Sequence, residues 1–360
     1  MPAISVVVPL YNKERYIRRC LESICRQTMR DFEVLVVDDG SSDASAEIAA
    51  SIPDPRIRVI RQENRGEGGA RNRGIQESRG ELVAFLDSDD EWRPSFLEAI
   101  ADLRRAYPEA GILATGYRRC RSGPLDMETT LADPPSGTRR LVPNYLSLAM
   151  RGNLVCSSSV AILHSVLAEV GGFPEREPFG ADRDLWVRIA LKYPLAYDVR
   201  VCSIYHSEAE GRAQDRRPVG PVCPPVVRTL RKAVKEGRIP GHRLREVQLY
   251  SDLTQMQYVY WQMHVRNRAN AVALLREGYF LPWFRILALG CRALLSFLPV
   301  RVVEAIRLKP QNATQRVKSL FSSGGTEYRH KDLLIREVPT EIDTADPELG
   351  ATDLQTTNSL

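Results

Sequence analysis

The stretch Leu-Val-Ala-Phe-Leu-Asp-Ser-Asp-Asp, residues 82–90, constrains the fold of this chain more than any other feature. Its short apolar run predicts a buried strand, and three carboxylates follow: Asp87, Asp89 and Asp90. Open α/β sheets bind ligands at the carboxyl ends of their strands. Because clustered carboxylates repel one another, this position favours a hard cation, Mg²⁺ or Mn²⁺, that carries a phosphate-bearing ligand. The alternative is a solvated acidic turn that caps the next helix.

The first hundred residues alternate between strand and helix patterns. Apolar, largely β-branched runs predict strands, and helical spacing or capping residues predict helices between them. This βαβα order predicts an α/β fold with a largely parallel central sheet flanked by helices. The predicted strands cover residues 4–8, 32–37, 56–60, 82–86, 111–115 and 155–163, and the predicted helices cover 15–26, 42–48, 68–75 and 184–192. The polar residues 118–140 predict a loop.

Charge is unevenly spread, although the net charge of the 360 residues is only +5. Residues 212–318 hold 20 Lys and Arg against 6 Asp and Glu, and residues 327–360 hold 8 Asp and Glu against 3 Lys and Arg. We therefore expect three parts. These are an α/β domain over residues 1–215, a basic helical extension over 216–324 and an acidic, disordered tail over 325–360.

The basic extension predicts helices over residues 226–235, 244–275 and 283–307. In residues 279–307, bulky apolar side chains alternate with arginines, and no run is long enough to span a bilayer. One interpretation is a helical hairpin that packs on the core. The other, which we favour, is a peripheral contact with an anionic membrane surface.

The cysteines and the N-terminus bear on the compartment. Seven cysteines occur without a C-x-x-C pair, and the sequence enters a predicted strand directly, without a signal-peptide pattern. We therefore expect a cytoplasmic protein at the inner face of the membrane.

Four polar loops follow the predicted strands and should meet at one edge of the sheet. They supply an aromatic ring, carboxylates, glycines and a cation beside a helix start, over residues 9–12, 38–41, 64–72 and 87–90. This set suits a nucleoside diphosphate, with Arg71 on phosphate or base oxygens and a metal bridging the phosphates. Each loop alone could be a turn or a cap. The glycine-rich loop is not a Walker A motif, because no Gly-Lys-Ser/Thr follows.

Taken together, these segments resemble the signature of family 2 glycosyltransferases. The matching stretches are Val-Val-Val-Pro-Leu-Tyr-Asn-Lys, Val-Val-Asp-Asp-Gly-Ser-Ser-Asp, Asn-Arg-Gly-x-Gly-Gly-Ala-Arg-Asn-x-Gly and Leu-Asp-Ser-Asp-Asp. The resemblance covers residues 3 to about 208. The resemblance implies a GT-A fold and the transfer of a sugar with inversion at its anomeric carbon. The donor would be a nucleotide-sugar, and a UDP-sugar is favoured.

The resemblance also assigns roles on the donor side. Asp39 would lie near the imide of uracil, Asp87 near ribose or the sugar, and Asp89 would ligate Mg²⁺ or Mn²⁺ on the diphosphate. His206 would contact the diphosphate or act as a further metal ligand, as Asp87 also could. The residues expected to bind the nucleotide-sugar are Pro9, Tyr11, Asn12, Asp39, Asn64, Arg71, Asp87 and Ser88.

A second set of segments carries the acceptor side. Gly171 to Glu175 looks like the family's Gly-Gly-Phe-Asp-Glu turn, and Gly180 to Trp186 looks like its Glu-Asp-x-Asp-Leu-Trp segment. Asp182 matches the position of the general base that takes the proton of the acceptor hydroxyl. The alternative role of Asp182 is to cap the helix that follows. Of the two carboxylates, we expect Asp184 to have the structural role. Ala181 departs from the family, which usually has Glu there.

Two other functions remain open at this point. A nucleotidyltransferase can share the sheet and the carboxylates, but it usually needs a glycine-rich loop after the first strand, where this chain has Pro-Leu-Tyr-Asn-Lys. A non-catalytic binding protein with a GT-A-like fold is the other alternative. We expect a glycan or lipid-linked acceptor, as in polysaccharide assembly, and no nucleic-acid partner.

Overall fold

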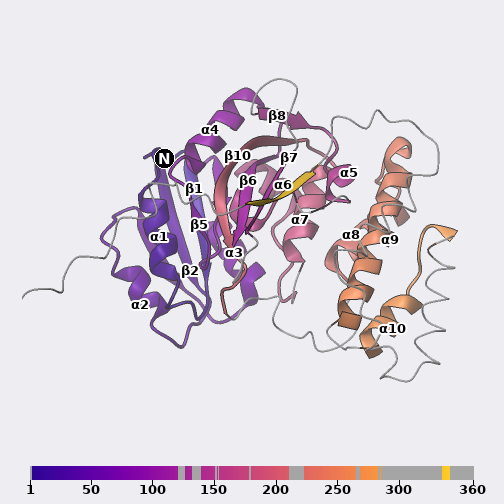
Figure 1. Cartoon of the computed structure of the whole chain (residues 1–360), viewed down its shortest axis with the longest axis horizontal. Coiled ribbons are helices and arrows are strands. Elements are labelled where there is room, and N and C mark those ends of the chain that lie inside the picture. Colours follow the sequence, from indigo (N-terminus) through magenta and orange to yellow (C-terminus); the bar gives the residue numbers. More distant parts are fainter. Residues whose placement is uncertain are drawn as a thin grey trace, which may run out of the picture.

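The computed structural model describes residues 2–120, 126–131, 139–150, 152, 154–177, 180–210, 223–264, 268–282, 284 and 335–340. A mixed sheet forms the centre, helices cover both of its faces, and further helices lie beyond one side (Figure 1). The strands are β1 Ile4–Leu10, β2 Phe32–Asp38, β3 Ile57–Arg61, β4 Leu82–Phe85, β5 Glu91–Trp92, β6 Ile112–Cys120, β7 Asp126–Leu131, β8 Arg139–Val142, β9 Val160–Leu163, β10 Leu195–His206 and β11 Ile335–Thr340. The helices are α1 Ile17–Cys25, α2 Ser45–Ala50, α3 Gly66–Glu77, α4 Phe96–Ala106, α5 Tyr145–Ala149, α6 His164–Val170, α7 Ala181–Ala190, α8 Pro225–Lys235, α9 Gly241–His264 and α10 Arg268–Arg276.

The first four strands form the parallel part of the sheet, in the order β3-β2-β1-β4. Strand β9 runs antiparallel between β4 and β6, and β10 is parallel to β6. Because β1, β2 and β4 run in the same direction, the loops that follow them leave from one edge. The predicted α/β fold with a largely parallel sheet flanked by helices is therefore confirmed.

Strands β1 and β2 are buried along their whole length, which explains their unbroken apolar runs. Alternate residues enter different cores: Val7 belongs to the core that includes residues of α7 and α8, whereas Val6 and Val8 belong to the core that includes residues of α1 and α4. Helix α3 approaches β1 closely, because a Cβ at Gly74 would collide with the side chain of Val7. This contact places the start of α3 beside the carboxyl end of β1.

The second half departs from the prediction in two places. The expected loop over residues 118–140 contains the end of β6, strand β7 and the start of β8. The expected single helix over residues 244–275 is instead two helices, α9 and α10, which pack against each other through apolar side chains such as Tyr258, Val259 and Leu274. A side-chain amide on α9 strengthens this pairing, as Gln255 Nε2 donates to the carbonyl of Leu274 at 2.7 Å.

The segment expected to touch a membrane begins at the end of this helical pair. Tyr279 and Phe284 stack with their ring centroids 6.2 Å apart, and both are buried against α9 and α10. The backbone N–H groups of Phe280 and Leu281 donate to Asp252 at 3.1 and 2.9 Å. The start of this segment therefore packs internally, and residues 285–307 lie outside the described residues. No described helix is both long and apolar enough to cross a bilayer.

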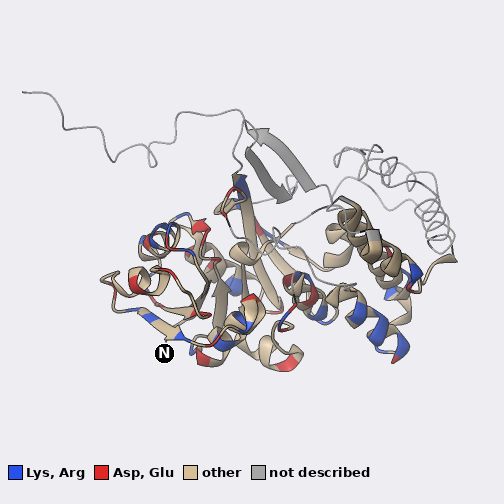
Figure 2. Ribbon diagram, turned by 90° about the horizontal axis from the view of Figure 1, so that it is seen from below, with Lys and Arg blue, Asp and Glu red and all other residues tan. Residues whose placement is uncertain are grey.

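The expected acidic tail lies mostly outside the described residues. Within it, Ile335–Thr340 forms β11, which pairs antiparallel with β7, a strand that the acidic composition does not predict. Lys and Arg residues are frequent on the C-terminal helices (Figure 2).

Candidate functional site

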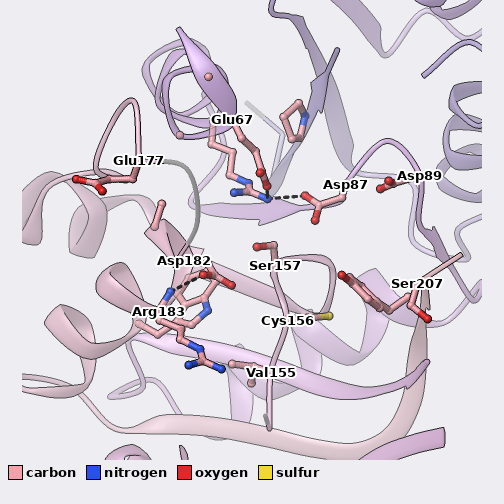
Figure 3. Close-up of a pocket in the computed structure, with 18 of the residues that line it drawn as sticks. Glu67, Asp87, Asp89, Val155, Cys156, Ser157, Glu177, Asp182, Arg183 and Ser207 are labelled. Atoms are coloured by element: carbon pink, nitrogen blue, oxygen red, sulfur yellow. Dashed lines mark hydrogen bonds and ion pairs between the residues drawn. The ribbon is translucent and has the colours of Figure 1, made fainter. Parts of the chain in front are cut away.

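A cavity of about 1160 Å³ lies at the edge of the sheet where β1, β2 and β4 end. Asp87 and Asp89 lie on one side of it, and Asp182 and Arg183 lie across from them (Figure 3). The predicted site residues that line it are Pro9, Tyr11, Asp39, Asn64, Arg71, Asp87, Ser88, Asp89, Asp182 and His206. Asn12 is not among the lining residues. It has a left-handed backbone (φ +51°), and its Oδ1 accepts from the N–H of Ser42 at 2.8 Å, so its geometry serves the turn between two loops.

Arg71 is the buried centre of the first wall. Its Nη2 lies 2.6 Å from Asp87 Oδ1 and also pairs with Glu67, one turn earlier on α3. Its guanidinium carbon lies 5.1 Å from the centroid of the Phe173 ring. The Arg71 side chain is 3% exposed, whereas Asp87 and Glu67 reach the cavity. Arg71 therefore neutralises two carboxylates that repel each other and orders this wall of the cavity.

These charges shift the pKa of Glu67 and of Arg71. Arg71 opposes the shift, but burial and the carboxylates of Asp87, Asp182 and Asp89 leave the pKa of Glu67 raised. Burial disfavours the charged guanidinium, but the carboxylates of Glu67 and Asp87 raise the pKa of Arg71. The wall therefore has more negative charge than Arg71 balances, and it is suited to a ligand that brings a cation.

Asp89, the expected metal ligand, is held by a lysine. Lys13 Nζ lies 2.8 Å from Asp89 Oδ2 and donates to the carbonyl of Glu210 at 2.6 Å. Among the described residues, no three His, Cys, Asp or Glu side chains converge to hold an ion by themselves. The donor set still fits Mg²⁺ or Mn²⁺, because hard carboxylate oxygens suit these ions, and Mg²⁺ is often bound by one or two carboxylates with phosphates and water. Asp89 and Asp87 are the residues that would hold such an ion.

Asp90, the third carboxylate of this stretch, is structural. It is 1% exposed, and it accepts from Ser158 Oγ at 2.5 Å and from the N–H of His206 at 2.9 Å. Burial, together with the charges of Asp89 and Asp87, raises its pKa. Asp90 therefore joins the loop after β4 to the turn before β9 and to the end of β10, and it fixes the backbone that carries His206.

The ring of His206 lies between two glutamates. Its Nε2 is 2.9 Å from Glu91 and its Nδ1 is 2.7 Å from Glu208. Burial opposes the charged ring, but the hydrogen bonds with Glu91 and Glu208 raise the pKa of His206. Both ring nitrogens thus face carboxylates, and a metal could bind His206 only by displacing one of them.

Asp39 organises the loop that begins α3. Its Oδ1 accepts from Gln62 Nε2 at 2.7 Å and from the N–H of Arg65 at 2.8 Å, and its Oδ2 accepts from the N–H of Gly66 at 2.8 Å. These N–H groups at the start of a helix would otherwise lack partners. Asp39 therefore caps α3 from another loop, and it remains among the residues that line the cavity.

The second wall is built on the first turn of α7. Gly180 precedes it with φ +78°, and Asp182 Oδ1 accepts from the N–H of Arg183 at 2.7 Å. Two residues on, Asp184 is buried, with Oδ2 2.8 Å from Arg188 Nε and Oδ1 accepting from Thr229 on α8. The structural role expected of Asp184 is confirmed, and Asp182 is the carboxylate of this turn that lines the cavity.

Several lining residues were not predicted from the sequence. Glu67 lies in the glycine-rich loop, and Lys13 directly follows the first polar loop. Their roles depend on partners 4 and 76 positions away along the chain. The C-terminal helix α9 supplies a further group of lining residues.

Comparison with known proteins identifies the family. Residues 5–161 match the sequence profile described as Glycosyl transferase family 2. The match covers a little under half of the chain, and it places residues 5–161 in glycosyl transferase family 2. The chain is 48% identical over 118 residues to a putative glycosyltransferase, EpsH, of Bacillus subtilis strain 168, which covers 32% of this chain and 34% of that protein. It is 31% identical over 212 residues to an uncharacterized glycosyltransferase of Rickettsia felis, covering 58% of this chain and 35% of that protein. The chain thus spans about a third of the length of each of these relatives.

Solved structures of similar fold extend further along the chain. TarS of S. aureus, residues 1–349 in complex with UDP-GlcNAc, superposes with a TM-score of 0.57 and 21% identity over 88% of each chain. The mannosyltransferase PcManGT of Pyrobaculum calidifontis, in complex with GDP-Man and Mn²⁺, superposes with a TM-score of 0.51 and 22% identity, over 90% of this chain and 88% of that one. These likenesses support a GT-A fold for the chain, including its C-terminal helices.

Proposed function

We propose that this chain is a metal-dependent, inverting glycosyltransferase that moves a sugar from a nucleotide-sugar, preferably a UDP-sugar, to a hydroxyl of a glycan or lipid-linked acceptor. The observation that carries the proposal is that Asp87 and Asp89 line the same cavity as Asp182 (Figure 3). One carboxylate pair faces the place for a diphosphate, and the third stands across the cavity from it. A cavity of about 1160 Å³ is large enough for both substrates.

The proposed chemistry divides between the two walls. A bound Mg²⁺ or Mn²⁺ would neutralise the charge that develops on the leaving diphosphate. Asp89 and Asp87 would hold that ion, and Arg71 would keep Asp87 oriented through its 2.6 Å contact. Asp182 would take the acceptor proton on Oδ2, because Oδ1 already accepts from the N–H of Arg183. The transfer requires no nucleophilic side chain from the enzyme.

The proposal extends to the class of donor and to the place of the protein in the cell. The UDP and GDP sugars bound by structural neighbours support a nucleotide-sugar donor without choosing the base. The basic segment over residues 212–318 supports peripheral contact with an anionic membrane at the cytoplasmic face, in the assembly of a polysaccharide.

A donor screen tests the proposal directly. UDP-, GDP- and dTDP-sugars would be tested for binding by calorimetry, and for slow hydrolysis, each with and without Mn²⁺. We expect one nucleotide class to bind, with higher affinity when Mn²⁺ is present. Failure of every donor to bind with Mn²⁺ would refute the nucleotide-sugar proposal. Incorporation of a nucleotidyl group into product would instead identify a nucleotidyltransferase.

A further inference from the structure

One face of α9 forms part of the cavity wall, far along the chain from the residues of the family match. The lining residues on α9 recur at spacings of three and four, which places them on one side of the helix. They are Tyr250, Leu253, Thr254, Gln257, Tyr258 and Trp261. We call this set the α9 face. It lies outside residues 5–161, so the family profile assigns it no role.

The α9 face combines flat rings with hydrogen-bonding groups. Tyr250, Tyr258 and Trp261 supply the rings, and Thr254 and Gln257 supply a hydroxyl and an amide. Leu253 is the single aliphatic member of the face among the α9 residues that line the cavity. Side chains with an apolar body and a polar edge suit a ligand that has the same two characters.

The α9 face reaches Asp182 through direct packing. A Cβ at Gly180 would collide with the hydroxyl of Tyr258, so α9 approaches the start of α7 as closely as a glycine allows. Arg183, the neighbour of Asp182, donates from Nη1 to Gln257 Oε1 at 3.4 Å. The α9 face and the proposed base therefore form one continuous wall.

Electrostatic effects report the same proximity. Burial is the main cause of the raised pKa of Tyr250, and Asp182 adds to it against the opposing charge of Arg183. Burial also dominates at Tyr258, where Arg183 opposes and Asp182 again raises the pKa. Both tyrosines thus stay neutral at physiological pH, and both lie close enough to Asp182 for its charge to act on them.

We propose that the α9 face binds a sugar ring of the acceptor, the ring that carries or adjoins the hydroxyl deprotonated by Asp182. This inference rests on the proposed function and narrows its acceptor to one that places a sugar ring beside the base. A sugar ring presents C–H faces to aromatic rings and hydroxyl edges to Thr254, Gln257 and Arg183. A polyprenyl chain has an apolar surface alone, and it does not match the hydroxyl, amide and guanidinium groups of this wall.

The experiment is saturation-transfer NMR on the full chain with UDP, Mg²⁺ and a set of soluble disaccharides of glucose, galactose, mannose and N-acetylglucosamine. The variants are Trp261→Ala and Gln257→Ala, and Gln257 is exposed enough for its truncation to leave the fold intact. The matched control is Tyr260→Ala, which truncates a ring on the same helix that does not line the cavity. We expect at least one disaccharide to give signals, and its Kd to rise about tenfold in Trp261→Ala but not in the control.

The UDP signals in the same sample distinguish a failure of the proposed function from a failure of the inference about the α9 face. Loss of UDP signals from the unchanged protein would contradict the proposed function itself. Retained UDP signals with no disaccharide bound, or with equal disaccharide affinity in all variants, would overturn the inference about the α9 face. Binding of a short polyprenyl phosphate in place of every disaccharide would overturn it as well.

Discussion

Replacing Arg71 with methionine should destabilise the protein, because it removes the one guanidinium that lies between Glu67 and Asp87. Breaking a fully buried ion pair typically costs about 3–5 kcal/mol, and an exposed one costs about 0–1 kcal/mol. The Arg71 side chain is 3% exposed, but Asp87 is 21% and Glu67 44% exposed. The two carboxylates left behind can therefore be partly hydrated. We expect a loss of about 2–3 kcal/mol in the free energy of unfolding at pH 7.

The loss in the free energy of unfolding should become larger as the pH rises. The pKa of Glu67 is already raised in the folded protein, although Arg71 holds it down. Removing Arg71 raises it further, so the folded state of the variant favours the protonated carboxyl more strongly. A raised folded pKa gives stability that is present below the unfolded pKa and is lost as the pH rises. The deficit of Arg71→Met should thus be smaller at pH 5 than at pH 8.

Urea denaturation of Arg71→Met and of a control, Arg65→Met, would measure this. Arg65 precedes the same helix and pairs with Glu175 at 2.8 Å. Both of these side chains are more than a third exposed, so solvent weakens the pair. The control should lose less than about 1 kcal/mol, with little dependence on pH. Equal losses in the two variants, or a deficit of Arg71→Met that grows towards pH 5, would refute the argument.

Three further predictions concern single contacts. Lys13→Met frees Asp89 from a competing cation, so the affinity for Mn²⁺ without donor, measured by electron paramagnetic resonance, should rise about three- to tenfold; a weaker affinity would contradict this. Asp184→Ala removes the buried carboxylate that accepts from Arg188 Nε and from Thr229, and it should cost about 1–3 kcal/mol in urea unfolding, while UDP binding is retained. Asp54→Asn should cost about 1 kcal/mol at pH 7, because the hydrogen bond from Arg56 lowers the pKa of Asp54. Since a lowered pKa gives stability only above the unfolded value, that cost should shrink in thermal melts towards pH 3, and a constant cost would contradict it.

The sequence predicted what depends on local pattern. The apolar run before Asp87 is a buried strand, and the parallel order of β1, β2 and β4 brings its carboxylates to the edge expected. A helix was predicted over residues 184–192, and α7 begins three residues earlier, with Asp182 in its first turn. In each case the periodicity or the capping residue lies within a few positions of the feature that it predicts.

The sequence did not predict what depends on distant partners. Nothing near Lys13 shows that it will reach Asp89, because the contact joins loops 76 positions apart. The pattern of α9 indicates a helix, but its apolar and aromatic residues could equally face a core, α10 or a cavity. The break between α9 and α10 was missed because the apolar spacing continues across both helices. Asn12 resembled a ligand contact, whereas its side chain serves the neighbouring turn.

The division of labour between the two walls is tested most directly by Asp182→Asn. This change keeps the side-chain shape and the oxygen that accepts from Arg183, but it removes the base. The measurement is the rate of sugar transfer beside the Kd for the nucleotide-sugar with Mn²⁺. We predict that transfer falls by about 10²- to 10⁴-fold with the Kd unchanged. Transfer at the original rate, or a loss of donor binding that parallels the loss of rate, would contradict the account.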